Sequence, residues 1–404
     1  MSSPSWVPPH GVVTPEWLEA ELDADAAVTV SREERTLFDR LAGGPGADLL
    51  LFGAGNLGRR TLAGLRRAGV EPLAFVDNNR SRHGTLVEGR VVLSPEEAAA
   101  RYGDRAVVVV TIWTPLGRLA YPGVAAQMRI LGCSRTVPFA PLFWKFQEEF
   151  LPNFCLDAPH KLYAHADDVK AGYRILVDET SRTEYLTQLS YLLSAMDSVE
   201  VTILPDREWY FPRDLVELSA REVFVDCGAY DGDTVESFIE ASGGQFRAVV
   251  AFEPDPHAVV RLRTLVQELS PQVRDRIRVE QKAVGAAAGS LAFEGGGTPG
   301  SRVSEAGTLT VECVTLDAAL QDVAPTFIKM DIEGAEEDAL LGAADTIRTH
   351  RPILAICIYH LQAHLYRLPT LIGGMCADYS LFVRRQGRDG DLVCFAIPNE
   401  RLRR

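Results

Sequence analysis

The chain has 404 residues, a formal net charge of −14 and a hydrophobic fraction of 47%. This length exceeds one ordinary core, so at least two domains are expected, and the composition is that of a globular protein. An acidic surface repels phosphate backbones and anionic membranes, which argues against nucleic acid and membrane partners. No apolar run approaches the roughly 18–20 residues that span a bilayer.

The N-terminal residues and the cysteines bear on the cellular compartment. The first 17 residues contain neither the basic region nor the apolar region of a secretion signal. The seven cysteines show no CxxC spacing, so neither a zinc knuckle nor a redox dithiol is predicted. Several lie inside apolar, strand-like runs. Reduced thiols and a cytoplasmic location are therefore expected.

Changes in sequence pattern divide the chain into four parts. Residues 1–45 form a polar, helical lead-in, and residues 46–140 alternate strands with helices. Residues 141–220 break this alternation and contain an expected amphipathic helix at 183–195, so we interpret them as a helical connector. The alternation resumes over 221–404. Strands that alternate with helices predict parallel sheets covered on both faces, and hence an α/β chain with two Rossmann-like domains.

The first of these domains contains a glycine fingerprint. Gly53, Gly55 and Gly58 have Gly-x-Gly-x-x-Gly spacing between a strand at 47–52 and a helix at 57–68. Asp77 follows 19 residues after Gly58, at the end of a strand expected at 71–76. A glycine fingerprint alone is a weak signal, but here it has its full structural context.

The same region resembles the Rossmann-like N-terminal domains of bacterial sugar acyltransferases and epimerase-like proteins, which implies a nucleotide or nucleotide-sugar ligand. The alternative is a degenerate domain that binds nothing and holds the substrate or a dimer partner. No Tyr-x-x-x-Lys pair follows, so hydride transfer has no support from the sequence.

In the second domain, a parallel series precedes two strands that the turn residues 387–390 join into a hairpin. This order resembles that of a class I methyltransferase sheet. An antiparallel insertion is expected from 290–294 and 308–314. The expected strands are 223–227, 248–252, 277–284, 327–330, 353–359, 379–384 and 392–397, and the expected helices are 233–241, 256–269 and 335–349.

The segment VFVDCGAYDGDT predicts a cofactor loop. Gly228 and Gly232 flank a turn that follows the strand-end residue Asp226, and glycines allow a ligand to approach the backbone closely. The Asp226 carboxylate would suit the amino group of a methionine moiety. Tyr230 replaces the third glycine of the usual Asp-x-Gly-x-Gly-x-Gly run, and a generic βα turn is the alternative. Glu253 lies 27 residues after Asp226, where an acidic residue accepts bonds from both ribose hydroxyls.

A group of charged residues is expected at the carboxyl edge of the same sheet. The segment FIKMDIEGAE opens a helix after a strand, and AICIYH ends the adjacent strand with a histidine. A second histidine follows four residues later, where it would share a helical face with the first. The residues concerned are Lys329, Asp331, Glu333, Glu336, His360 and His364.

Residues 200–400 resemble the FkbM family of S-adenosylmethionine-dependent methyltransferases. The motifs that carry the resemblance are YFPRDL, DCGAYDGDT, FEPDP, KMDIEGAE, PILAICIYH and the closing hairpin. The resemblance implies O-methylation of a hydroxyl on a natural product or sugar-containing molecule. His364 departs from the family, where an acidic residue is expected. The expected S-adenosylmethionine contacts are Asp226, Gly228, Tyr230, Asp231, Gly232, Thr234, Glu253, Pro254, Ala283 and Asp331.

A neutral hydroxyl needs a base or a metal before it can attack the methyl group. We expect Asp331 and His360 nearest that proton, with Glu333 and Lys329 orienting them. In the alternative, Asp331, Glu333 and His360 bind magnesium or manganese. Tyr210 and Tyr230 either pack on adenine or substrate or belong to the core.

The expected partner is a small-molecule acceptor, and the sequence leaves a homodimer open. Two other classes of function compete with the methyltransferase. One is an oxidoreductase or epimerase that uses NAD(P) or a nucleotide sugar in the first domain. The other is a non-catalytic nucleotide sensor, which leaves the charges around Asp331 unexplained, because uncompensated charge at a strand end is costly.

Overall fold

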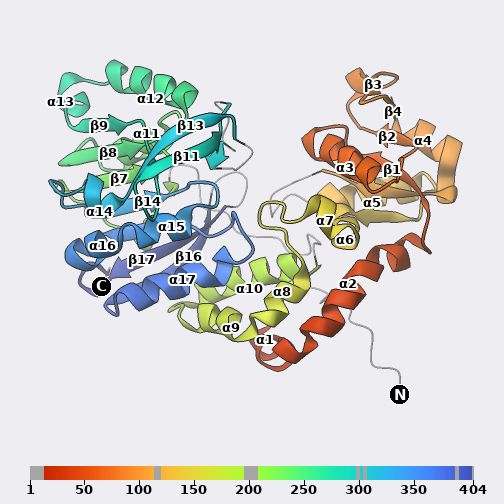
Figure 1. Cartoon of the computed structure of the whole chain (residues 1–404), viewed down its shortest axis with the longest axis horizontal. Helices are drawn as coiled ribbons and strands as arrows, with labels where there is room; N and C mark the ends of the chain where they lie inside the picture. Colours follow the sequence, from red (N-terminus) through yellow and green to blue (C-terminus); the bar gives the residue numbers. More distant parts are fainter. Residues whose placement is uncertain are drawn as a thin grey trace. The chain divides into compact units, whose positions relative to one another are not determined.

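The computed structural model describes residues 13–112, 120–194, 208–296, 301–303, 307–386 and 391–402. The chain divides into two compact units. The N-terminal unit is Met1–Lys170 with Leu186–Val201, and the C-terminal unit is Ala171–Tyr185 with Thr202–Arg404. The division passes through α9 (Ala166–Arg174) and α10 (Glu179–Ser194), which lie in the segment interpreted as a connector. The α/β fold class is confirmed in both units (Figure 1).

The N-terminal unit is built on a six-stranded sheet with the order β3-β4-β2-β1-β5-β6. All neighbouring pairs are parallel except β3 with β4. The strands at the centre are apolar along almost their whole length, as expected when helices cover both faces. The strand bounds are β1 Asp48–Phe52, β2 Ala74–Val76, β3 Leu86–Val87, β4 Arg90–Leu93, β5 Ala106–Val110 and β6 Thr136–Pro138.

Polar residues at their ends define several helices of this unit. The Thr14 side chain accepts from Trp17 N at the start of α1, and Ser94 forms a capping box with Glu97 on α4. Gly43 ends α2 in the left-handed conformation. The helices are α1 Pro15–Glu21, α2 Ala27–Ala42, α3 Asn56–Arg67, α4 Pro95–Tyr102, α5 Ala120–Ile130, α6 Phe139–Lys145, α7 Gln147–Phe150 and α8 Pro159–Ala164, with 3₁₀ turns η1 Ala24–Ala26, η2 Arg80–Arg82 and η3 Gly103–Arg105.

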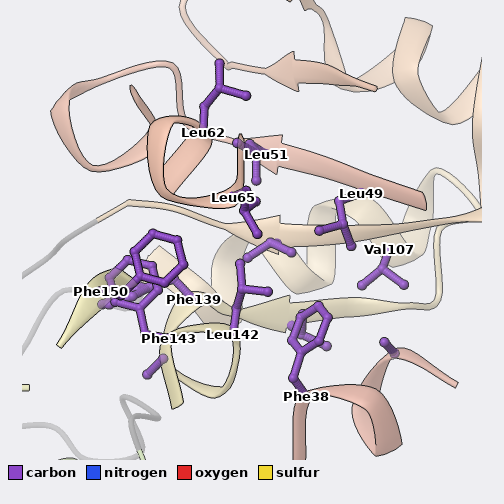
Figure 2. Close-up of a cluster of buried hydrophobic side chains, with 14 of the residues drawn as sticks. Phe38, Leu49, Leu51, Leu62, Leu65, Val107, Phe139, Leu142, Phe143 and Phe150 are labelled. Atoms are coloured by element: carbon purple, nitrogen blue, oxygen red, sulfur yellow. The ribbon is translucent and has the colours of Figure 1, made fainter. Parts of the chain in front are cut away.

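One core of the N-terminal unit joins the sheet to the aromatic segment after β6. Figure 2 shows Phe139, Phe143 and Phe150 gathered together. The Phe143 and Phe150 rings stack with centroids 4.2 Å apart. Gly64 on α3 makes room for them, because a Cβ there would lie 2.2 Å from the Phe150 ring. The aromatic residues of the expected connector therefore include core residues of the N-terminal unit.

The C-terminal unit contains a seven-stranded sheet with the order β16-β17-β15-β14-β7-β8-β9. The five strands from β15 to β9 are parallel, and β17 and β16 close the sheet as an antiparallel pair. The chain runs from β7 to β8 on one side and later returns to β14 on the other, so the β7/β14 boundary is a topological switch point. The bounds are β7 Val223–Cys227, β8 Ala248–Phe252, β9 Ile277–Glu280, β14 Phe327–Met330, β15 Ile353–Cys357, β16 Tyr379–Gln386 and β17 Asp391–Pro398.

Helices flank this sheet, and α17 packs against α15 and α16 (Figure 1). Phe224 of β7 stacks on Phe238 of α11 with ring centroids 4.6 Å apart, which fixes one helix to the sheet. The helices are α11 Asp233–Ala241, α12 Pro256–Glu268, α13 Pro271–Arg274, α14 Leu316–Ala319, α15 Glu336–Leu341, α16 Ala344–His350 and α17 His364–Met375, and the 3₁₀ turn η5 covers Asn399–Arg401.

A second, four-stranded sheet corrects one prediction. Residues 277–284 do not form one strand: β9 belongs to the large sheet, whereas β10 (Ala283–Val284) pairs with β13 in the small one. The predicted antiparallel insertion is confirmed, since β11 pairs antiparallel with β13. The small sheet has the order β10-β13-β11-β12, with β11 Gly289–Glu294, β12 Arg302–Val303 and β13 Leu309–Val314.

The predicted helix 335–349 is also wrong as a single element, because it breaks between α15 and α16 at Gly342. A Cβ on Gly342 would lie 2.1 Å from the carbonyl oxygen of Gly285. The Gly342 carbonyl accepts from Asp317 N at 2.9 Å instead of continuing the helical ladder. Close backbone contact with two other segments therefore stops the helix.

Buried polar contacts bring residues 171–185 and 208–216 to the final hairpin. Arg384 lies 2.6 Å from the Asp178 carboxylate and 2.8 Å from that of Asp214. The Gln386 side-chain oxygen accepts from Tyr210 N at 2.8 Å, which fixes the position of this tyrosine.

Two other predictions concern the closing hairpin and the membrane. The expected turn at 387–390 lies outside the described residues. Within the part of the chain that the structure describes, no helix has the length and apolar character needed to cross a membrane.

Candidate functional site

The loop between β7 and α11 is held by backbone hydrogen bonds to the end of β8. Gly228 N and Ala229 N both donate to Phe252 O, at 3.0 and 3.1 Å. Gly228 has φ +79°, and a Cβ there would lie 1.9 Å from Asp331 O. Gly232 has φ +102°, and its Cβ would lie 2.5 Å from Leu265. Contacts within the protein therefore require glycine at both positions. From the sequence alone, the same two glycines are explained by the close approach of a ligand.

Tyr230 occupies the position at which the sequence lacks the third glycine. Its φ is +44°, a conformation that glycine adopts readily and that is strained for tyrosine. The Arg261 guanidinium lies over its ring, 4.9 Å from the centroid. Asp231 is half-exposed, 3.9 Å from the same arginine, and Thr234 is buried in the first turn of α11.

Glu253 ties this loop to the end of β8. Its carboxylate accepts from Tyr230 N at 2.9 Å and from Asp255 N at 2.8 Å. Burial raises the pKa of this carboxyl to about 7, although the two amides oppose the shift. Pro254 is half-buried beside it. Each carboxylate oxygen retains a lone pair, so Glu253 can also accept from ribose hydroxyls.

Ala283 takes a different position from the other expected cofactor residues. It is buried in β10 and pairs with Cys313 in the four-stranded sheet. The other expected residues lie at or after the ends of strands β7, β8 and β14.

Asp226 and Lys329 form a closed ion pair on the neighbouring strands β7 and β14. The Lys329 ammonium lies 2.9 Å from Asp226 Oδ1, and both side chains are almost completely buried. Asp226 Oδ2 has no hydrogen-bond partner in the described part of the chain. Burial raises the pKa of Asp226 to about 6. The Lys329 pKa is also raised, because the Asp226 and Asp331 carboxylates outweigh the effect of burial. The expected ligand for a methionine ammonium is thus already paired with an internal ammonium.

Asp331 lies at the end of β14 and connects this ion pair to the histidine. Tyr210 Oη donates to Asp331 Oδ2 at 2.7 Å, and its ring lies 5.2 Å from the Lys329 ammonium. His360 Nε2 lies 3.2 Å from Asp331 Oδ1. Burial would raise the pKa of Asp331, but His360 and Lys329 lower it to about 2. Tyr210 has φ +61°, so backbone strain accompanies its position.

Glu336 is the centre of the contacts around the histidines. His360 Nδ1 bonds to Glu336 Oε1 at 2.8 Å, and His364 Nδ1 lies 3.2 Å from Oε2. The same carboxylate accepts from Ile332 N at 2.9 Å and Gly334 N at 3.1 Å. The prediction of a shared helical face is wrong, because His360 precedes α17 and His364 is its first residue. They converge on one carboxylate instead.

The charges around His360 bear on its expected role. Burial would lower its pKa, but Glu336 and Asp331 raise that pKa well above the ordinary histidine value. The pKa of Glu336 is lowered mainly because His360 outweighs burial. These two carboxylates favour the protonated form of His360, and that form is a poor general base. The Asp331 carboxylate remains available as the proton acceptor.

Glu333 completes the cluster. Its Oε2 lies 3.8 Å from His360 Nε2, and its backbone has φ +55°. One ligand atom from each of Asp331, Glu333 and His360 falls within 4.8 Å of the others. The structure therefore brings all four expected catalytic residues to the β14–β15 edge. Sequence reasoning gives Glu336 no role and does not decide that of Tyr210, because their partners lie 24 and 121 residues away.

The glycine fingerprint of the N-terminal unit forms the expected βα turn. Gly53 has φ +112°, and a Cβ on Gly58 would lie 1.9 Å from Gly53 O. Gly55 precedes α3, and nothing lies within 4 Å of its Cβ position. Asp77 already accepts from Ala54 N at 3.0 Å and Asn79 N at 2.8 Å. Its Oδ2 also lies 3.2 Å from Arg82.

Comparisons with known proteins agree with the C-terminal geometry. Residues 226–385 match the model of the methyltransferase FkbM domain. No curated protein matches the chain. The solved structure of methyltransferase FkbM from Methylobacillus flagellatus KT is 23% identical, with a TM-score of 0.76 over 95% of this chain and 100% of that one. At this identity the likeness concerns the fold.

Two further solved structures match a smaller part of the chain. A putative rRNA-methylase from Clostridium thermocellum is 12% identical, with a TM-score of 0.32 over 49% of this chain and 98% of its own. Fibrillarin from Aeropyrum pernix, solved with S-adenosyl-L-methionine, is 11% identical, with a TM-score of 0.30 over 46% of this chain and 71% of its own. The family match over β7–β16, together with the sheet order and the strand-end cluster, shows that this chain carries an FkbM methyltransferase domain in its C-terminal unit.

Proposed function

We propose that the chain transfers a methyl group from S-adenosylmethionine to a hydroxyl oxygen of a small natural product or sugar-containing molecule. The observation that carries this proposal is the juxtaposition, at the switch point, of the Glu253-tethered loop and the Asp331 cluster. Ligands of open α/β sheets bind at such a point. The family match supports the methyl-transfer chemistry.

Glu253, at the end of β8, fits a role in cofactor binding better than Asp226 on β7 does. Glu253 offers lone pairs beside a loop whose backbone is preorganised. Asp226 is inaccessible and paired with Lys329, so it supports the site from within. When bound, S-adenosylmethionine supplies an electrophilic methyl group on sulfur.

Asp331 is the residue best placed to handle the acceptor proton. Its side chain is 22% exposed, whereas that of His360 is 2% exposed. The acceptor oxygen forms the new C–O bond, the electrons of the S–CH₃ bond stay on sulfur, and the hydroxyl proton leaves to Asp331 and then to water. His360 and Tyr210 fix the two oxygens of that carboxylate.

The first test is calorimetric titration of the full chain with S-adenosylhomocysteine. We expect micromolar binding that weakens about tenfold in Glu253→Gln, or about 1.4 kcal/mol. Glu268→Gln, an exposed residue at the end of α12, is the matched control and should bind as the wild type. Absence of binding, together with NAD(P)H or nucleotide-sugar binding that is lost on substitution of Gly55, would transfer the chemistry to the N-terminal unit.

The acceptor class is tested separately, with a panel of hydroxyl-bearing small molecules and mass detection of the methylated product. Asp331→Asn should abolish turnover and leave S-adenosylhomocysteine binding within about twofold, because the two roles fall on different residues. Methylation of nitrogen or carbon, but not of oxygen, would contradict the hydroxyl assignment.

A further inference from the structure

We propose that Asp331, Glu333 and His360 bind one divalent cation at the carboxyl edge of β14 and β15. The binding itself stands apart from the proposed function. Only the catalytic role of the cation rests on methyl transfer to a hydroxyl.

The three ligand atoms have spacings that suit one ion. His360 Nε2 lies 3.2 Å from Asp331 Oδ1 and 3.8 Å from Glu333 Oε2, and all three atoms lie within 4.8 Å. Metal–ligand bonds of about 2.1 Å place neighbouring ligand atoms about 3–4 Å apart. A cation therefore fits between them with little movement of the side chains.

A buried nitrogen that makes no hydrogen bond among the described residues points into this space. His360 is 3% exposed, and its Nε2 makes no hydrogen bond with any residue that the structure describes. The contact with Asp331 has the distance of an ion pair without hydrogen-bond geometry. An imidazole nitrogen that is buried among carboxylate oxygens in this way has the arrangement of a metal ligand.

The contacts behind the cluster are those of an outer coordination shell. Glu336 takes the Nδ1 side of His360, which orients Nε2 toward the carboxylates. Metal-ligating histidines commonly bond to a carboxylate through their other nitrogen. Tyr210 likewise donates a hydrogen bond to Asp331 Oδ2, so that Asp331 Oδ1 faces His360 Nε2.

The backbone and the charges around the cluster agree with this assignment. Glu333 adopts φ +55° to place its carboxylate here, a strain that persists at functional sites. Three carboxylates, those of Asp331, Glu333 and Glu336, surround the single ring of His360. A divalent ion offsets this excess of negative charge.

The donor set indicates the class of cation and its use. Two carboxylates and one imidazole suit Mn²⁺, and Mg²⁺ should bind the same set more weakly. The Asp331 and Glu333 side chains remain 22% and 18% exposed, which leaves coordination positions open on the solvent side. An acceptor hydroxyl bound there would lose its proton to solvent water more readily.

The test is titration of the metal-stripped full chain with Mn²⁺ alone. The electron paramagnetic resonance signal of free Mn²⁺ reports how much of the ion remains unbound. We expect one bound Mn²⁺ per chain in the wild type and affinity at least about tenfold weaker in Glu333→Gln. Glu333 is half-buried, so this variant should keep the circular dichroism spectrum of the wild type. Glu337→Gln is the matched control, because that glutamate lies on the same segment and pairs with Arg367 at 2.6 Å.

Binding that is weakened in Glu333→Gln and retained in Glu337→Gln supports the site. No Mn²⁺ binding by the wild type, or equal binding by the two variants, overturns it. S-adenosylhomocysteine titration of the same samples separates the two proposals. Cofactor binding without Mn²⁺ binding leaves the proposed function standing alone, and Mn²⁺ binding without cofactor binding leaves the metal site standing alone.

Discussion

The Lys329 ammonium lies 2.9 Å from the Asp226 carboxylate, and neither side chain is more than 2% exposed. The pair joins β7 to β14, the strands on either side of the switch point. Lys329 also donates to the carbonyl oxygen of Gly228 at 2.7 Å, so one ammonium holds both the carboxylate and the loop that follows it.

Removing one partner of this pair should be costly. We expect Lys329→Met or Asp226→Asn to lower the free energy of unfolding by about 3–5 kcal/mol, because either leaves a buried group uncompensated. The double variant should lose clearly less than the sum of the two losses. Urea unfolding followed by circular dichroism measures the cycle, and strictly additive losses would show that the residues do not interact.

The Lys329→Met variant should also respond to pH. Burial already raises the pKa of Asp226 to about 6, and loss of the ammonium raises this pKa further. The folded state then binds a proton that the unfolded state releases, so the stability of the variant falls as pH rises above about 4. Unfolding at pH 5 and pH 8 tests this, and a variant that is more stable at pH 8 would contradict it.

Cofactor affinity should depend on the protonation of Glu253. The pKa of this carboxyl is raised to about 7, and only its ionised form accepts from two further hydroxyls. Affinity for S-adenosylhomocysteine should therefore be constant above pH 7 and fall below it toward the roughly tenfold weaker binding of the neutral side chain. Glu253→Gln should bind weakly with no such slope between about pH 5 and 7. A wild-type profile as flat as that of the variant would remove Glu253 from the binding site.

Gly55 and Gly58, the second and third glycines of the N-terminal fingerprint, should differ in how well they tolerate substitution by alanine. Gly58→Ala should destabilise the N-terminal unit by about 1–3 kcal/mol, because its Cβ would lie 1.9 Å from Gly53 O. Gly55→Ala should fold as the wild type, since its φ is −83° and its Cβ position is open. Thermal unfolding of the two variants measures the difference. Equal losses would refute the packing argument.

Tyr230 provides a test of backbone strain. Tyr230→Gly and Tyr230→Ala both remove the ring that contacts Arg261, but only glycine adopts φ +44° without cost. The glycine variant should be the more stable of the two by about 1 kcal/mol. Urea midpoints compare them, and an alanine variant of equal or greater stability would mean that the loop does not hold this conformation.

Local patterns determined much of the fold. The strands at 223–227, 248–252 and 327–330 have the predicted bounds, because short apolar runs between turn residues have the length of buried strands. The same holds for α11. The helix break at Gly342 and the transfer of β10 to a second sheet could not be predicted, since both depend on contacts with Gly285 and Cys313.

For the candidate site, too, the sequence determined one part and the tertiary structure another. The sequence by itself determined which charged residues stand at strand ends, since Asp226, Glu253, Asp331 and His360 each follow an apolar run. Only the tertiary structure decided how they are paired. It paired Asp226 with Lys329, brought Tyr210 and His360 to the two oxygens of Asp331, and placed His360 between the Asp331 and Glu336 carboxylates. Electrostatic effects depend on distance and burial, and neither can be obtained from spacing along the chain.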